Sequence, residues 1–215
     1  MPALTKSIIA SLPANGPTDP IEYYRRPLVG WLFRERINLG LRMLPERRYE
    51  RAMEVGFAAG AVLHALADSV TELHGIDLDA DPAPVRASLA SRGRKADLRQ
   101  GSVYELPYES GMFDLVLSFS VFEHLHEYDK ALGEVSRVLK PGGLFLLGMP
   151  AVNTMMDAGF RAIGFKGIGH HHVTTPAKVA ACFASAGLRV VREKRLGLGP
   201  AIASVYYNWL LEKIA

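Results

Sequence analysis

The sequence predicts an α/β fold, in which helices cover both faces of a doubly wound, mostly parallel sheet. Two observations support this fold. From residue 51 onward, short apolar runs typical of buried strands alternate with amphipathic stretches of helical period. Strands that are separated by helices pair in parallel, because each crossover returns the chain to the same end of the sheet. The 215 residues, 49% of them hydrophobic, suffice for one domain with a full core.

The N-terminal part of the chain precedes this alternation. Residues 1–20 are rich in Pro, Asn, Gly and Thr and are predicted to be flexible. Residues 21–50 form a predicted helical cap, whose helices are interrupted at Pro27 and end at Pro45. The net charge of +3 comes from an excess of basic residues in this part. Aromatic side chains do not alternate with them as a base-stacking platform requires, so nucleic acid is not the expected partner.

The remaining domain, residues 51–215, is predicted element by element. Helices are expected over residues 60–69, 82–93, 128–139 and 175–187, the last two ending at Lys140-Pro141-Gly142-Gly143 and at Gly187. Residues 201–213 are predicted to be a last strand or a helix. The other strands are predicted over residues 51–57, 72–78, 95–102, 113–120, 144–150 and 188–196.

Several classes of protein are disfavoured by composition. Cys182 is the only cysteine, so no internal disulfide can form, which fits a cytoplasmic protein. No apolar run reaches the roughly 20 residues of a membrane span. The sequence has neither CxxC nor HExxH, and three adjacent histidines lack the spacing of a rigid ligand set. We therefore predict no metal site.

The stretch MEVGFAAGA, residues 53–61, is a strand-to-helix turn shaped for a ligand. Gly56 permits positive φ and close approach to the backbone, and the amides after Gly60 can receive polar groups. The second strand ends at Asp77, about 20 residues after the first turn glycine, where an acid binds ribose hydroxyls. The alternative is that Asp77 or Asp79 only caps the next helix.

Four ordered segments between about residues 50 and 150 resemble class I S-adenosylmethionine-dependent methyltransferases. The turn and the acid-ended second strand are the first two. The others are GSVYELPYESGMFDLVLSFSVFEHL, residues 101–125, and LGEVSRVLKPGGLFLLGMP, residues 132–150. The resemblance implies a Rossmann-like, seven-stranded sheet whose last strand is antiparallel. It also implies S-adenosylmethionine as cofactor.

The resemblance assigns a cofactor role to residues at four strand ends. Two of them depart from the family: Ala58 stands where glycine is usual, and Ser102 where an acid is usual. A hydroxyl accepts a weaker bond than a carboxylate, so these departures bear on cofactor affinity. The expected contacts are Glu54, Gly56, Phe57, Ala58 and Gly60 for the methionine side, Asp77 and Leu78 for the ribose and one adenine face, Ser102 and Val103 for the adenine edge, and Phe119 for the sulfonium.

The implied reaction moves a methyl group by in-line displacement to O, N or C of a small, partly apolar acceptor. The cofactor brings the activated methyl group, so the protein mainly orients the acceptor. A hydroxyl acceptor would benefit from a general base, for which His124, His171 and His172 are candidates. Each also has a non-catalytic interpretation, as an orienting or substrate-shaping residue.

Two segments are expected to shape the acceptor site. Residues 151–173 are interpreted as a lid carrying Met155 and Phe160, or else as a helix packed on the sheet. The cap would place Tyr24 near the methyl group; alternatively, its basic face contacts an anionic membrane. The oligomeric state is not predicted.

Two other functions compete with methyl transfer. One is a non-catalytic cofactor-fold protein that acts through a protein partner, which the departures at Ala58 and Ser102 would suit. The other is a nicotinamide-dependent oxidoreductase, which the glycine spacing disfavours.

Overall fold

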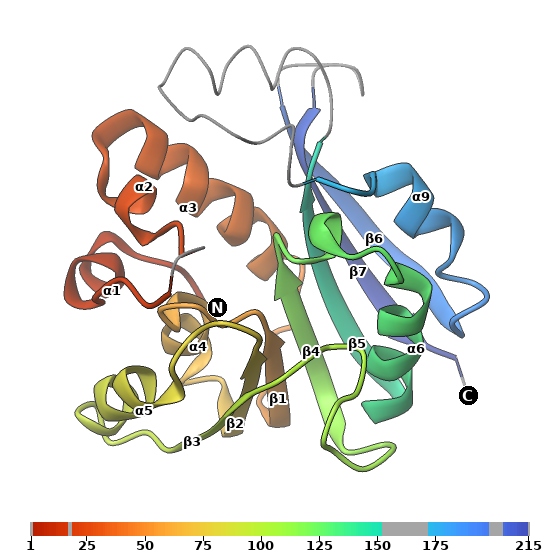
Figure 1. The fold of residues 1–215 in the computed structure, drawn as a ribbon, viewed down its shortest axis with the longest axis horizontal. Coiled ribbons are helices and arrows are strands. Elements are labelled where there is room, and N and C mark those ends of the chain that lie inside the picture. The colour runs from red at the N-terminus through yellow and green to blue at the C-terminus, as the bar shows by residue number, and fades with distance from the viewer. Residues whose placement is uncertain (1, 17–18, 152–171, 198–203, 215) are drawn as a thin grey trace.

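The fold is a seven-stranded sheet between two layers of helices (Figure 1). A computed structural model describes residues 2–16, 19–151, 172–197 and 204–214. The strands are β1 (Tyr49–Val55), β2 (Val70–Asp77), β3 (Ala96–Gln100), β4 (Phe113–Phe119), β5 (Leu139–Pro150), β6 (Leu188–Gly197) and β7 (Ser204–Lys213). The helices are α1 (Lys6–Ser11), α2 (Ile21–Arg25), α3 (Pro27–Leu41), α4 (Ala61–Leu66), α5 (Pro82–Ala90), the 3-10 helix η1 (Phe122–His124), α6 (Tyr128–Val138) and α9 (Pro176–Ala181).

The strand order is β3-β2-β1-β4-β5-β7-β6. Only β7 runs against its neighbours, pairing antiparallel with both β5 and β6, while the other described ladders are parallel. The predicted fold class, a doubly wound and mostly parallel seven-stranded sheet, is confirmed. Residues 204–213 are a strand because their apolar side chains enter both cores, Leu210 one and Leu211 the other.

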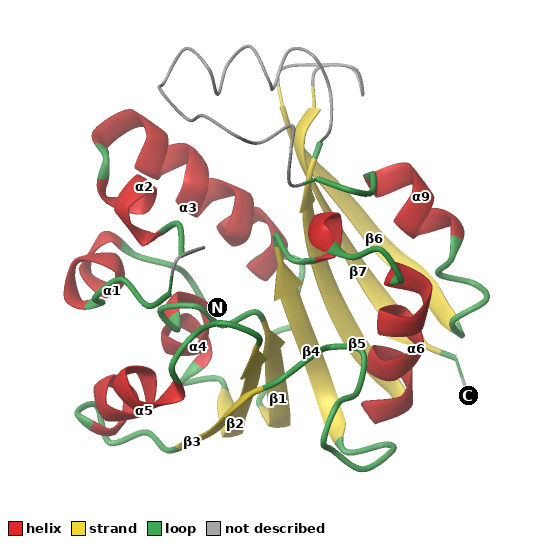
Figure 2. Cartoon of the chain, viewed as in Figure 1, coloured by secondary structure: helices red, strands yellow, loops and turns green. Residues whose placement is uncertain are grey.

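Each face of the sheet has its own hydrophobic core. Along β5, Leu144 and Leu146 pack on one side with α1–α5, whereas Phe145 and Leu147 pack on the other with α6 and α9. Figure 2 shows these two sets of helices on opposite sides of the sheet. Burial on both faces explains why the central strands read as continuous apolar runs in the sequence.

Several predicted boundaries differ from the structure, two of them by four or more residues. The helix expected over residues 175–187 is only Pro176–Ala181, and turns follow it. The turn at residues 140–143 lies within the bounds of β5, but the ladder with β4 passes from Leu139 directly to Leu144. These four residues therefore bulge out of the pairing.

The N-terminal segment packs closely against the domain. Leu4, Ile9 and Leu12 are buried, although residues 1–20 were expected to be flexible from their composition. Three apolar side chains at spacings of five and three residues give this short segment a buried face that composition alone does not reveal. Helix α3 contacts β5, β6 and β7, and Pro27 is its first residue.

The predicted lid lies mostly outside the described residues. Of residues 151–173, the structure describes Ala151, His172 and Val173, so Met155, Phe160 and His171 are not placed. Within the described ranges, no helix has the length and apolarity to span a membrane.

Candidate active site

The turn between β1 and α4 has the backbone geometry that its glycines predict. Gly56 and Gly60 adopt φ values of 80° and 78°. A Cβ on Gly56 would lie 2.3 Å from Val121 Cγ2, and one on Gly60 would lie 2.4 Å from Val85 Cγ1. Any side chain there would therefore be both strained and obstructed. Ala58 also has positive φ, 43°, which an alanine adopts only at a cost.

Asp77 ties the end of β2 to this turn. Its carboxylate accepts hydrogen bonds from the backbone N–H groups of Ala58 at 2.8 Å, Asp79 at 3.0 Å and Ala80 at 2.9 Å. The cap of α5 is instead Asp81, whose side chain accepts from Ala83 N at 2.9 Å. Asp77 thus organises two loops at the carboxyl ends of adjacent parallel strands, where α/β folds bind ligands.

Glu54 is a buried carboxylate beside Asp77. It is 3% exposed, and its Oε2 has no hydrogen-bond partner. Burial, reinforced by the negative charge of Asp77, raises the pKa of Glu54 well above its usual range. A positively charged ligand group would relieve both effects. We call Glu54, Gly56, Ala58, Gly60 and Asp77 the turn site.

The other predicted cofactor residues differ in how exposed their side chains are. Leu78 is 65% exposed, an unusual position for a large apolar side chain next to a ligand turn. Val103 is buried, while Ser102 accepts the Tyr104 N–H at 3.2 Å through its hydroxyl. Phe57 and Phe119 are buried in the core shared with the N-terminal helices.

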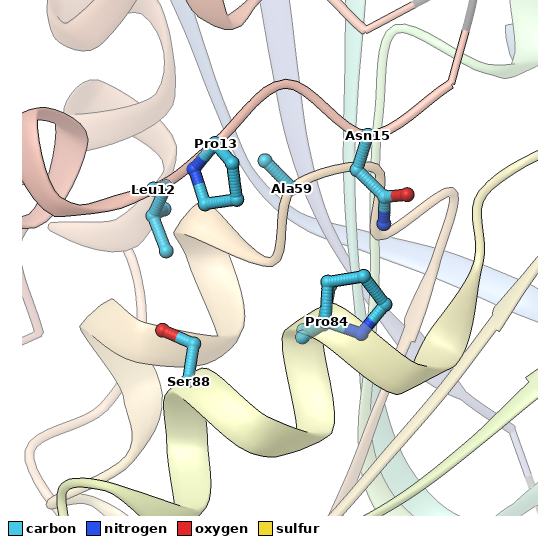
Figure 3. Close-up of a pocket in the computed structure, with 7 residues that line it drawn as sticks. Leu12, Pro13, Asn15, Ala59, Pro84 and Ser88 are labelled. Carbon is cyan, nitrogen blue, oxygen red and sulfur yellow. The ribbon is translucent and has the colours of Figure 1, made fainter.

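The N-terminal segment crosses the turn site from outside. The Asn15 side chain donates to Ala58 O and Asp81 O, both at 2.9 Å, and accepts from Asp81 N at 3.1 Å. A crevice of about 170 Å³, open solvent included, lies between this segment, Ala59 and α5 (Figure 3). It encloses no space for even a water molecule, so we do not assign the cofactor to it. Its lining residues are Leu12, Pro13, Asn15, Ala59, Pro84, Val85 and Ser88.

A second polar group lies beyond the neighbouring strand β4. Ser120 has φ of 57°, a rare value for serine, and its Oγ lies 2.9 Å from the Tyr206 hydroxyl of β7. The Arg36 guanidinium of α3 lies over the Tyr206 ring at 5.1 Å and over Phe33 at 4.3 Å. Backbone strain of this kind often marks a functional position.

Glu123 completes this group, which we call the β4 site: Arg36, Ser120, Glu123 and Tyr206. Glu123 is 1% exposed, and burial raises its pKa to about 8. Burial also raises the pKa of the Tyr206 hydroxyl, which therefore stays protonated. Glu123 Oε2 and Arg36 Nε are both buried without a hydrogen-bond partner. Unpaired buried polar atoms are uncommon in native proteins, and a bound ligand or ion is one of the explanations for them.

The structure places two of the three histidine candidates, His124 and His172. His124 and His172 lie together, with ring centroids 5.4 Å apart, and His124 Nε2 lies 3.9 Å from Glu123 Oε1. His171 is outside the described residues. Tyr24 is buried, stacks edge-on against Phe33 and accepts from Arg36 at 3.3 Å through its hydroxyl.

Sequence reasoning missed the members of the β4 site. Arg36 was counted only as part of a basic segment, and Tyr206 only as part of an ambiguous last element. The available signal was Ser120, three residues before Glu123 and directly after a buried strand, where a parallel sheet places ligand-binding residues.

Comparisons with known proteins agree with this geometry. Residues 53–147 match the family profile described as "Methyltransferase domain". A probable S-adenosylmethionine-dependent methyltransferase of Mycolicibacterium smegmatis is 37% identical over 99 residues, which are 46% of this chain and 37% of that protein. A malonyl-acyl-carrier-protein O-methyltransferase of Geobacter sulfurreducens is 30% identical over 151 residues, 66% of this chain and 56% of that one. The chain thus spans between about a third and a half of these relatives.

A solved structure supports the same conclusion for the fold. The PH0226 protein from Pyrococcus horikoshii superposes with a TM-score of 0.69 at 18% identity, covering 89% of this chain and 98% of that one. The domain match includes the whole turn site and the whole of β4. Residues 53–147, less than half of the chain, therefore match a methyltransferase-domain family, and the relatives and the fold support a class I methyltransferase that uses S-adenosylmethionine.

Proposed function

We propose that the protein transfers a methyl group from S-adenosylmethionine to a small, partly apolar acceptor, most favourably to an oxygen atom. The observation that carries the proposal is the adjacency of two polar sites. Val121 packs against Gly56 and lies between Ser120 and Glu123 in the chain, so the turn site and the β4 site adjoin. A methyl donor and its acceptor need such adjoining sites.

The turn site suits the cofactor. Glu54 Oε2, buried and without a partner, would accept the ammonium of the methionine part. Gly56 lets Val121 pack directly against the turn, where a Cβ would collide with it, and keeps the positive φ of the turn. A carboxylate offers about four acceptor positions, and Asp77 uses three for backbone amides. One ribose hydroxyl therefore fits on Asp77 without displacing a bond of the turn.

The adenine would lie between residues of the next two strand ends. Leu78 presents an exposed apolar surface, and Val103 is buried on the far side of the neighbouring β3. The Ser102 hydroxyl, which already accepts a backbone N–H, can donate to a ring nitrogen. Phe119 would flank the sulfur.

The β4 site suits the acceptor. The cofactor supplies a methyl group on positively charged sulfur, so the chain's residues need only position a nucleophile and exclude water. The protonated Tyr206 hydroxyl and Ser120 offer polar contacts, while Arg36 offers a cation to an anionic group. One relative is named as a malonyl-acyl-carrier-protein O-methyltransferase, which supports oxygen as the acceptor atom.

The buried arginines favour the cap interpretation of the N-terminal helices over membrane contact. Arg34 is buried and donates to Tyr24 O at 2.8 Å, and Arg36 packs on aromatic rings. Both guanidinium groups act inside the protein, so they are not available to lipid headgroups. Tyr24 supports this inner face and would act on the acceptor through Arg36.

Two measurements test the function. Calorimetric titration should show binding of S-adenosylmethionine and no comparable binding of NADH, which would instead indicate an oxidoreductase. A panel of small carboxylic acids, phenols and amines should then give turnover, followed as release of S-adenosylhomocysteine. Tight cofactor binding with no turnover on any acceptor, together with retention of a protein partner, would favour the non-catalytic alternative.

A further inference from the structure

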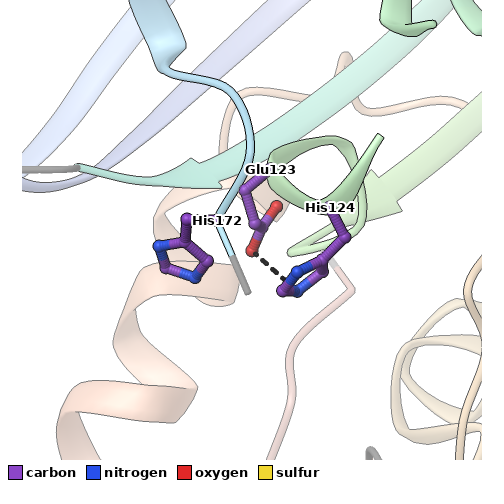
Figure 4. Close-up of side chains that lie close together, drawn as sticks. All are labelled: Glu123, His124 and His172. Carbon is purple, nitrogen blue, oxygen red and sulfur yellow. Dashed lines mark ion pairs between the residues drawn. The ribbon is translucent and has the colours of Figure 1, made fainter. Parts of the chain in front are cut away.

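Three potential metal ligands meet beside the β4 site. Glu123 and His124 belong to η1, and His172 lies in the segment before α9. One ligand atom from each lies within 4.8 Å of the others. Figure 4 shows the Glu123 carboxylate between the two imidazole rings. The cluster joins segments that are far apart in the sequence, so no local spacing motif announces it.

The backbone holds this arrangement in place. Glu123 O accepts the N–H of Val173 at 2.8 Å and that of Thr174 at 3.3 Å. These two bonds fix the chain next to His172 directly onto η1. Main-chain contacts therefore hold the two segments of the cluster together.

One atom of the cluster indicates a missing ligand. Glu123 is 1% exposed, and its Oε2 has no hydrogen-bond partner. Leaving a buried polar atom unpaired costs about 1–3 kcal/mol, more when the group is charged. A bound cation would remove that cost.

We propose that Glu123, His124 and His172 bind a divalent transition-metal ion of the zinc type. Two imidazoles and one carboxylate are a donor set that zinc and iron(II) use in sites with open coordination positions. Magnesium and calcium prefer oxygen ligands throughout. Arg36 also faces Glu123 and offsets its charge, which disfavours ions that depend on carboxylate charge.

The separations require only small movements. Ligand atoms around a tetrahedral zinc ion stand about 3.3 Å apart, as bond lengths near 2.0–2.1 Å dictate. The 3.9 Å between His124 Nε2 and Glu123 Oε1 can close by rotation of His124, whose side chain is 47% exposed.

The ion would refine the proposed function, on which this step rests, by selecting a hydroxyl or phenol acceptor. An acceptor oxygen in an open coordination position is more easily deprotonated, because the cation stabilises the oxyanion. The hydroxyl proton leaves to solvent. The oxygen lone pair then forms the O–CH₃ bond while the S–CH₃ bond breaks, and its electron pair remains on sulfur as a neutral thioether.

Metal binding is tested on the full chain without cofactor or acceptor. Titration with Co²⁺, followed by its visible absorption, and with Zn²⁺, followed by calorimetry, should each show one site. Glu123→Gln, His124→Gln and His172→Gln should each weaken binding by at least about tenfold. His126→Gln, at an exposed histidine two residues from His124, is the matched control and should change nothing.

Two outcomes would overturn the site. One is binding that survives Glu123→Gln but is lost in His170→Gln with His171→Gln, which would assign the ion to the adjacent histidines. The other is equal binding of Mg²⁺ alone. Methyl transfer that continues in a chelator would sink the metal inference and leave the proposed function intact. Metal binding without turnover would contradict the proposed function and leave the metal inference intact.

Discussion

The turn site and the β4 site adjoin on one edge of the sheet, yet they are built differently. The turn site consists mainly of backbone, with positive φ at Gly56, Ala58 and Gly60 and amides bonded to Asp77. The β4 site consists of side chains from α3, the end of β4 and β7. A site made of backbone fails when a side chain is added, whereas a site made of side chains fails when a functional group is removed.

The largest expected effect comes from adding a side chain at the turn. Gly56→Val should weaken S-adenosylmethionine binding by more than about 100-fold, because its Cβ meets Val121 and its φ resists a branched residue. Calorimetry measures the affinity, and circular dichroism checks folding. Gly93→Val is the control, since Gly93 has φ of 69° with nothing within 4 Å of an added Cβ. Equal losses in both would assign the effect to backbone strain alone.

The next effect concerns the carboxylate of the turn site. Asp77→Ala should weaken cofactor binding by about 10- to 100-fold, through loss of a charge-assisted bond of about 1.5–3 kcal/mol. Asp79→Ala, at an exposed neighbour, should have little effect. If Asp79→Ala proves the more damaging, the ribose contact belongs to Asp79.

The stability of the chain should depend on pH through His64, which lies in α4 directly after the turn. His64 accepts a hydrogen bond from Arg92 at Nδ1, at 2.8 Å, so Nε2–H donates to Ser88 Oγ and the ring is neutral. Burial, with the nearby Arg92 charge, lowers the pKa of His64 to about 4. The unfolded chain binds the proton nearer pH 6.5. The free energy of unfolding should thus fall by about 3 kcal/mol as the pH drops from about 6.5 to 4.

The variant His64→Gln separates this contribution from other titrating groups. Urea unfolding across that pH range should show a shallower loss of stability in the variant than in the parent chain. Identical slopes for the two proteins would show that His64 does not carry the dependence.

Removing one hydroxyl tests the β4 site. Tyr206→Phe keeps the ring in the core but loses the contact with Ser120. Turnover should fall about tenfold, equivalent to about 1.4 kcal/mol, while cofactor affinity stays within about twofold. Tyr207→Phe, which alters a ring stacked on Trp209 in the other core, should leave turnover unchanged. A loss of cofactor affinity in Tyr206→Phe would show that Tyr206 also serves cofactor binding and that the two sites are not separate.

The smallest expected effect is a gain in stability. Ala58→Gly relieves a left-handed backbone that costs alanine about 1–2 kcal/mol, while glycine loses about 0.5–1 kcal/mol more entropy on folding. The free energy of unfolding should therefore rise by about 0.5 kcal/mol. Ala59→Gly has no such strain to relieve and should destabilise the chain. A stability loss in Ala58→Gly would mean that the Ala58 methyl group makes stabilising packing contacts.

The same contrast explains what the sequence could predict. The alternation of strands and helices and the turn site follow from local features, such as apolar periodicity, glycine spacing and an acid at a strand end. Arg36, Ser120 and Tyr206 meet only because α3 and β7 pack beside β4, and no local pattern encodes that meeting. The histidine pair was anticipated by residue type, but its joining to Glu123 depends on the same tertiary contacts.

The position of β7 also matters for how the protein is made. Residues 204–213 are synthesised after β6 but lie between β5 and β6, and β6 pairs with no other described strand. Until they emerge from the ribosome, the β5 edge is unpaired and open to wrong partners. The turn site needs only earlier residues and can form first. The nascent chain therefore gains its binding turn before Tyr206 arrives to complete the neighbouring site.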